Sequence, residues 1–223
     1  MSLDDLFRQL SILIGLPSVY VVGAAAAVVV VARDWRAVLY GYALVSVVLA
    51  FLLSQVIPAE WALQQAIIGG LVAVMLYLSA GQLRESRGRY RSAELRWPQM
   101  ASLTSFRLLA VALIGGIFIV ARDNIQLPLI EPVLRDAFLW LVLIGLLGLA
   151  LHEEPLHAGL SLLIVLGGSQ LFLFTLTRQR VLVGIMQGGQ LLLGLAIAYL
   201  VLARGLTAFQ PEPPPAGPRG EQA

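Results

Sequence analysis

The chain has 223 residues, with no cysteine and no lysine, and charged residues make up only 13% of it. Without cysteine there can be no disulfide, no thiolate metal site and no cysteine-ligated iron–sulfur cluster. All 15 basic residues are arginine; with 13 acidic residues they give a net charge of +2, which says nothing about nucleic acid. The sequence also lacks P-loop, GxSxG, HExxH and dinucleotide-binding motifs. It therefore carries no soluble-enzyme signature.

Apolar sequence is what the chain has in abundance. Hydrophobic residues make up 59% of it and the mean hydropathy is +0.85, far above an ordinary soluble domain. A helix needs ~20 apolar residues to cross a bilayer. We therefore predict an all-α polytopic membrane protein with about seven transmembrane helices. The first runs through Pro17 to Ala32, and the others cover residues 37–57, 61–80, 101–121, 137–151, 156–177 and 181–203.

The fifth predicted span is short, because only 15 uncharged residues separate Asp136 from His152. We expect it to borrow a turn at either end or to cross a thin part of the bundle. The helical membrane domain is predicted over residues 1–209, and the tail 210–223, rich in Pro and Gly, is predicted to be disordered. No basic segment precedes the first span, so we expect it to be retained rather than cleaved as a signal peptide.

The arginines predict the orientation in the membrane. Most of them gather on one side, in the basic loop 81–100 above all, and Arg107 adds to that side. That side receives Arg33, Arg36, Arg84, Arg87, Arg89, Arg91, Arg96, Arg204 and Arg219; the other receives Arg8, Arg122, Arg135, Arg178 and Arg180. Because cytoplasmic loops carry the excess of basic residues, the N-terminus is predicted outside and the C-terminus in the cytoplasm. The loop could also bind anionic lipid or an acidic partner.

Small and amide residues stand in the last two spans where lipid-facing leucine or valine would be expected. They are Gly167, Gly168, Gln170, Gly184, Gln187, Gly188 and Gln190. Glycines let helix backbones approach and amides hydrogen-bond between helices. We therefore predict that the two spans pack on each other or on a partner through these residues. The alternative is that the glutamines line a path for water.

Every aspartate and glutamate is predicted to lie outside the spans. A helix that translocates protons normally needs an ionisable group inside the membrane, so this absence argues against an autonomous proton pump. Glu153 and Glu154 stand closest to a span and are the candidate proton-related residues. His152 and His157 flank them and are interpreted as part of an interfacial polar turn, because a metal or haem site needs more ligands than this turn offers.

Spans 1–3 and 5–7 suggest an internal repeat of two three-helix units, with the fourth span linking them. The third span carries Gln64 and Gln65 followed by Gly69 and Gly70, and the last span likewise has a glutamine, Gln187, followed by a glycine pair, Gly188 and Gly189. The alternative is that both spans use these residues independently for helix packing.

Short motifs of the C-terminal half carry a family resemblance. They are Gly145-Leu146-Leu147, the turn His152–Glu154, Leu166-Gly167-Gly168-Ser169-Gln170-Leu171 and Val201-Leu202-Ala203-Arg204. This half resembles the E-type membrane protein of hydrogenase-4 complexes, which is related to the K-type small subunit of complex I and to the C subunit of multisubunit cation/proton antiporters. The resemblance implies a non-catalytic membrane subunit of an energy-converting oxidoreductase complex, surrounded by lipid and by other membrane subunits.

The chain departs from that family where the family carries intramembrane carboxylates. At those places it has Val165 or Leu166 in one span and Gln190 or Leu191 in the last. The family's role in proton conduction is therefore not carried over. No cofactor is assigned. The alternative function, from another class, is a stand-alone membrane transporter or channel for a neutral solute.

Overall fold

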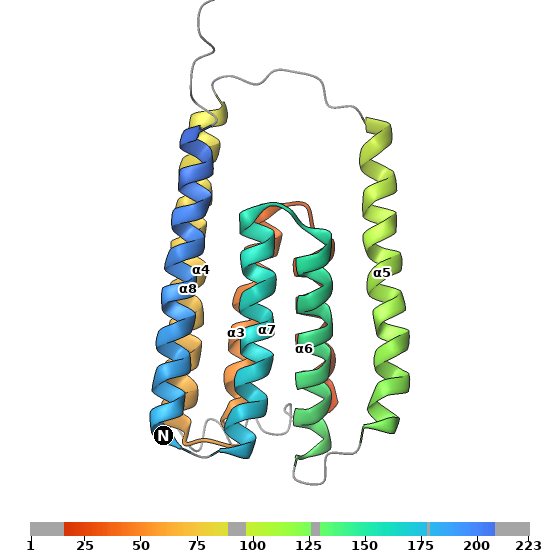
Figure 1. Ribbon diagram of the computed structural model, residues 1–223, viewed down its shortest axis with the longest axis vertical. Helices are drawn as coiled ribbons and strands as arrows, with labels where there is room; N and C mark the ends of the chain where they lie inside the picture. The colour runs from red at the N-terminus through yellow and green to blue at the C-terminus, as the bar shows by residue number, and fades with distance from the viewer. Residues whose placement is uncertain (1–15, 89–96, 126–129, 178, 208–223) are drawn as a thin grey trace, which may run out of the picture.

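The computed structural model describes residues 16–88, 97–125, 130–177 and 179–207 of the chain (Figure 1). These ranges form helices and no strand. The helices are α2 (Leu16–Val31), α3 (Trp35–Leu53), α4 (Ala59–Gly88), α5 (Trp97–Asn124), α6 (Pro132–Leu151), α7 (Pro155–Leu176) and α8 (Arg180–Thr207). Six of them are long and apolar enough to cross a membrane, and α2 is a shorter apolar helix. The predicted all-α polytopic membrane fold is confirmed.

Several helix ends differ from the prediction. The fifth span begins at Pro132 rather than at residue 137, so it has 20 residues and gains a turn at its N-terminal end. Proline is favoured in the first turn of a helix, and Arg135 pairs with Asp136 at 2.9 Å, which lets both charges lie within α6. The segment between the fourth and fifth predicted spans, residues 122–136, is therefore shorter as a connection, and α5 shortens it further by continuing to Asn124.

The predicted basic loop 81–100 is also partly helical, because α4 continues to Gly88 and α5 begins at Trp97. Hydropathy marks where a helix leaves the apolar layer, whereas arginine and glutamate are good helix formers and let it continue. The predictions for Arg89, Arg91 and Arg96, for the N-terminal residues 1–15 and for the tail 210–223 lie outside the described residues.

The helices are arranged in two layers of three, with α5 beside them. One layer contains α2, α3 and α4, and the other contains α6, α7 and α8; α2 packs on α6, α3 on α7 and α4 on α8 (Figure 1). Each helix runs in the same direction as its counterpart in the other layer. The helix α5 packs against α6 and α2 at one edge. This is the layout expected for two three-helix units and a linking helix.

Glycines bring neighbouring helices close together. A Cβ on Gly145 of α6 would lie 3.0 Å from the carbonyl oxygen of Ser161 in α7, and one on Gly148 would collide with the Ser161 side chain. On α8, a Cβ on Gly194 would lie 2.7 Å from the side chain of Val72 in α4. Small residues of this kind allow close backbone packing between helices in membranes.

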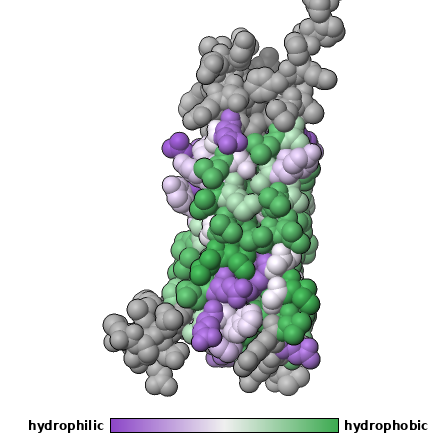
Figure 2. Space-filling view, turned by 90° about the vertical axis from the view of Figure 1, so that its left-hand side faces the viewer, coloured by the Kyte–Doolittle hydropathy of each residue, from purple (hydrophilic) through white to green (hydrophobic). Residues whose placement is uncertain are grey.

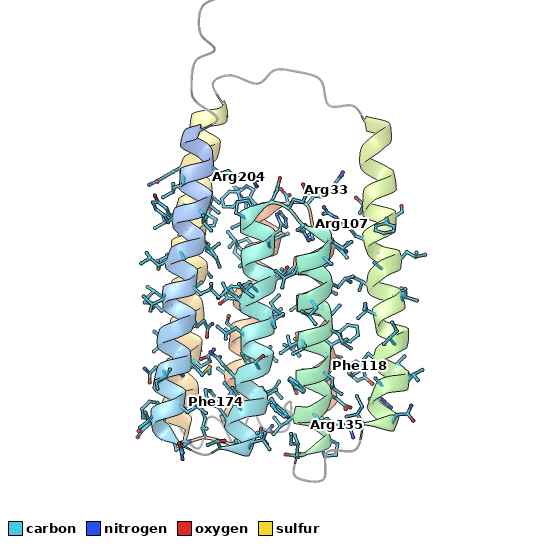
Figure 3. All side chains as sticks on the ribbon, viewed as in Figure 1. Arg33, Arg107, Phe118, Arg135, Phe174 and Arg204 are labelled. Carbon is cyan, nitrogen blue, oxygen red and sulfur yellow. The ribbon has the colours of Figure 1, made fainter. Side chains whose placement is uncertain are left out.

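The distribution of polar residues agrees with a membrane-spanning molecule. Figure 2 shows one face on which hydrophobic residues cover the middle and hydrophilic residues gather towards the ends. Arg33, Arg107 and Arg204 lie at one end of the bundle and Arg135 lies at the other, on the sides that the arginine pattern predicts (Figure 3). Which end faces the cytoplasm stays a prediction.

Candidate functional site

The helices bring four polar side chains together inside the bundle. Tyr42 comes from α3, Gln65 from α4, Gln170 from α7 and Gln190 from α8, and we refer to these four residues as the glutamine centre. Each is at most 2% exposed. Because α3 and α4 belong to one layer and α7 and α8 to the other, the centre joins the two layers.

The four side chains are hydrogen-bonded to one another. The amide nitrogen of Gln65 donates to the Oε1 atoms of Gln170 at 3.0 Å and Gln190 at 2.7 Å. The amide nitrogen of Gln170 donates to Gln190 Oε1 and to the backbone oxygen of Met186, both at 3.2 Å. Gln190 in turn donates to the Tyr42 hydroxyl at 3.1 Å. Gln190 therefore connects the three other members.

Gln187 lies beside the centre, one turn before Gln190 on α8. Its amide nitrogen donates to the backbone oxygen of Trp61 at 3.2 Å, which links α8 to α4 a second time. Two buried amide oxygens have no hydrogen-bond partner among the described residues, namely the Oε1 atoms of Gln65 and Gln187. A buried polar atom without a partner costs ~1–3 kcal/mol, so a water molecule at either atom would be favourable.

The chemistry of the centre is that of neutral groups. Amides do not titrate, and a phenol has an ordinary pKa of about 10. The centre can therefore fix helix positions or orient water, but it holds no carboxylate or imidazole that could gain and lose a proton near neutral pH. The prediction that Gln170 and Gln190 hydrogen-bond between helices is confirmed.

The glycines of the two candidate segments have different surroundings. Gly167 and Gly168 of α7 are buried: a Cβ on Gly167 would lie 2.9 Å from Leu49, and one on Gly168 would lie 3.1 Å from Leu141. Gly184 and Gly188 of α8 are exposed, and a Cβ on either would meet nothing within 4 Å. The prediction that these two pack against α7 is wrong.

The error has a geometrical cause. The buried stripe of α8 passes through Val183, Gln187, Gln190 and Gly194, which follow one another at three- or four-residue steps. Gly188 follows Gln187 directly, so it is turned by about 100° from Gln187 around the helix. Gly184 lies three residues before Gln187, on the side of Gln187 that is opposite to Gln190. The two glycines therefore lie beside this stripe, facing outwards.

The acidic candidates lie at the end of the bundle that carries Arg33, Arg107 and Arg204. Glu153 and Glu154 are exposed in the turn between α6 and α7. The backbone oxygen of Glu153 accepts a hydrogen bond from Arg204 at 3.1 Å, and the Glu154 carboxylate lies 3.1 Å from Nδ1 of His157.

In the six helices that are long enough to span, the only acids within the apolar stretches are Glu60 and Asp136, each in the first two turns. The prediction that every acid lies outside the spans is thus wrong for these two, because the helices begin earlier than predicted.

The two histidines form a buried pair at the same turn. Their rings are stacked, with centroids 4.8 Å apart and planes within 5°. Nδ1 of His152 lies 3.0 Å from the backbone oxygen of Gly148. Burial lowers the pKa of His152, and the positive charge of Arg107 lowers it further. Among the described residues no three His, Asp or Glu side chains are placed to hold a metal ion.

Sequence reasoning missed Tyr42 and did not connect Gln65 to the site. A signal for Gln65 was present, because glutamine precedes a glycine pair in both α4 and α8, and these two helices are neighbours. Nothing in the sequence marks Tyr42, one of six tyrosines.

Comparisons of the chain with protein-family models, with curated proteins and with solved structures found no match. The resemblance to hydrogenase-4 membrane proteins therefore stays a prediction from the sequence, and the geometry of the bundle is the main basis for a proposal about function.

Proposed function

We propose that the chain is a non-catalytic membrane subunit of a larger energy-converting complex, of the hydrogenase-4 or complex I kind. The observation that carries the proposal is the glutamine centre. It joins four helices and both layers through neutral hydrogen bonds between buried side chains. Such a centre holds helices in place, while proton translocation would require an ionisable group at that depth. Positioning neighbouring subunits and sealing the membrane around them is the role that fits.

The outer surface supports the role of a subunit. No residue is buried in the apolar stretch Thr104–Arg122 of α5. On α8, the pattern Gly184-x-x-x-Gly188 faces outwards, and this pattern allows two transmembrane helices to approach closely. Both surfaces would be available to helices of partner subunits in such a complex.

A second candidate function is a path for a small neutral solute. It is favoured by the unpartnered Oε1 atoms of Gln65 and Gln187, which a hydrogen-bond donor such as water or urea would satisfy. The helices α2, α5 and α6 border a crevice, and neither glutamine belongs to its lining. The support for this function is therefore limited to those two atoms.

Purification from the native membrane tests the proposed function. The chain, tagged at its C-terminus, is extracted in a mild detergent and resolved on a native gel, and the co-migrating proteins are identified by mass spectrometry. We expect large antiporter-like membrane subunits in the same band. The purified chain in liposomes should transport neither urea nor glycerol. If the chain migrates alone and transports either solute, the second candidate function would take the place of the proposed role as a subunit.

The same complex tests whether the subunit conducts protons. We expect Glu153→Gln and Glu154→Gln to leave coupled proton transport within about a factor of two, because both carboxylates are exposed outside the helices. Gln170→Leu serves as the control inside the bundle, since glutamine cannot titrate, and assembly is checked on native gels. Loss of pumping by an assembled Glu153 or Glu154 variant would mean that the subunit takes part in conduction.

A further inference from the structure

A crevice of about 750 Å³ lies between α2, α5 and α6. Pockets that bind small ligands have volumes of ~300–1,000 Å³. The hollow exists because α2 and α5 have small residues where they face each other. These residues are Gly23, Ala24 and Ala27 on α2 and Ala112, Gly115 and Gly116 on α5.

The indole of Trp140 on α6 lines the crevice. A Cβ on Gly23 would lie 2.6 Å from its Nε1 atom, and one on Gly115 would lie 3.6 Å from its Cη2 atom. Phe118 of α5 meets the indole edge to face, with ring centroids 5.0 Å apart. Two glycines and an aromatic ring therefore border the indole, which adds a largely apolar surface to the lining and one buried N–H without a partner among the described residues.

The charged residues among the described lining of the crevice lie at one end of it. Arg122, near the C-terminal end of α5, and Asp136, in the second turn of α6, belong to its lining. Asp136 also accepts hydrogen bonds from Arg135 at 2.9 and 3.1 Å. These residues lie near the helix ends, where long polar side chains reach the headgroup region. An occupant therefore needs an apolar body and, at this end, a head with both signs of charge.

We propose that the crevice binds an acyl chain of a zwitterionic phospholipid, with its headgroup at Arg122 and Asp136. The chain spans a membrane, so lipid is the medium at an apolar opening between its helices. The phosphate would accept hydrogen bonds from the guanidinium, and an ethanolamine ammonium would donate to the carboxylate. An anionic headgroup could also bind a guanidinium, but it has no ammonium to donate to Oδ2 of Asp136, since both hydrogen bonds from Arg135 go to Oδ1. This inference does not depend on membership of a larger complex.

Gly116→Leu tests the proposal directly. Gly116 lines the crevice, and a Cβ there meets nothing within 4 Å, so the side chain of a leucine would start in open space and occupy part of the crevice. Gly70→Leu on α4 is the matched control, because that position is equally open and lies outside the crevice lining. Retained lipid is measured by native mass spectrometry after reconstitution with phosphatidylethanolamine, phosphatidylglycerol and diacylglycerol of identical acyl chains.

We expect the parent and Gly70→Leu to retain one phosphatidylethanolamine and Gly116→Leu to retain at least about fivefold less, equivalent to ~1 kcal/mol. Arg122→Gln should reduce the preference for phosphatidylethanolamine over diacylglycerol, and Asp136→Asn the preference over phosphatidylglycerol. Melting curves establish that each variant is folded, and Arg122→Gln alone decides the headgroup question if Asp136→Asn does not fold.

Three results would overturn the proposal. Equal retention by Gly116→Leu and Gly70→Leu would show that the crevice is not the lipid site. A parent that retains diacylglycerol or phosphatidylglycerol as well as phosphatidylethanolamine would show that no zwitterionic headgroup is recognised. A dimer of the parent that Gly116→Leu dissociates would show that a second copy of the chain occupies the crevice.

Discussion

In α7, Gly167 and Gly168 lie against side chains of other helices, whereas in α8 Gly184 and Gly188 face away from the other described helices. Both pairs stand within three residues of a buried glutamine, Gln170 or Gln187. Two similar segments of sequence thus have opposite surroundings. The difference shows that position within the bundle decides whether such a glycine packs.

The positions of the two helices explain the difference. The helix α7 lies in the middle of its layer and packs against α6, α8, α3 and α2. The helix α8 lies at the edge of the layer and packs against α7 and α4. A helix at an edge leaves about half of its circumference to lipid or to a partner, and Gly184 and Gly188 lie on that half.

Gly168→Leu is expected to have the largest effect. A Cβ there would lie 3.1 Å from Leu141, 3.2 Å from Val142 and 3.5 Å from the backbone oxygen of Phe138, so a leucine would push α7 away from α6. Overpacking of this kind costs ~1–3 kcal/mol. The measurement is the thermal melting midpoint of the purified chain in detergent. A variant that melts like the parent would show that α7 and α6 are not in contact there.

Gln190→Leu comes next, and Gln187→Leu is its control. The first removes the side chain that links Tyr42, Gln65 and Gln170, and the second removes a single bond together with an acceptor that has no partner. Hydrogen bonds between helices in membranes average ~0.6 kcal/mol and reach ~1.7 kcal/mol. We expect Gln190→Leu to lie near the upper figure and Gln187→Leu to melt close to the parent. The reverse order would show that Gln190 does not connect the centre.

A pH titration distinguishes the contribution of the histidine pair to stability from that of the glutamine centre, whose amides do not titrate. Burial lowers the pKa of His152, so the unfolded chain takes up a proton at a higher pH than the folded chain. Stability is therefore complete above the unfolded pKa of about 6.5 and decreases as the pH falls through that value towards the folded pKa. Below the folded pKa, where His152 is protonated in the folded chain as well, stability no longer changes with pH through this group.

His152→Asn should reduce this dependence, because its amide can still donate to the backbone oxygen of Gly148 but does not titrate. Melting midpoints of the parent and the variant are compared between about pH 8 and about pH 5. An unchanged slope in the variant would assign the pH dependence to another group. Gln170→Leu should leave the slope as it is.

Much of the fold could be predicted from the sequence, because a bilayer requires helices whose length follows from hydropathy. The helix ends were less predictable. Arg135 and Asp136 were expected outside the fifth span, yet they pair with each other within α6, and a hydropathy pattern does not register such a pair. The layout of two units and a linking helix was suggested by the order of glutamine followed by a glycine pair, which α4 and α8 share.

The candidate site could be predicted only in part. Gln170 and Gln190 were identified because an amide within an apolar span needs a partner. Tyr42 was not, because a tyrosine in a span is compatible with lipid contact, with the headgroup region or with a hydrogen bond, and only the rotation of α3 decides among them. The prediction for Gly184 and Gly188 was wrong for a similar reason, because the sequence does not determine the rotation of α8 about its axis.

Gly188→Leu is expected to have the smallest effect, and it tests the comparison of α7 with α8 most directly. In the isolated chain it should change stability by less than ~0.5 kcal/mol, since a Cβ there meets nothing within 4 Å. Gly168→Leu measured in parallel shows that the assay detects overpacking.

In the native membrane the expectation differs, because a partner helix packed closely on Gly184 and Gly188 would be displaced by a leucine. A variant that melts like the parent but loses its co-migrating subunits would assign this face of α8 to the interface of the complex. One that keeps them would assign the face to lipid, and one that melts early would show that the face is covered within the chain itself.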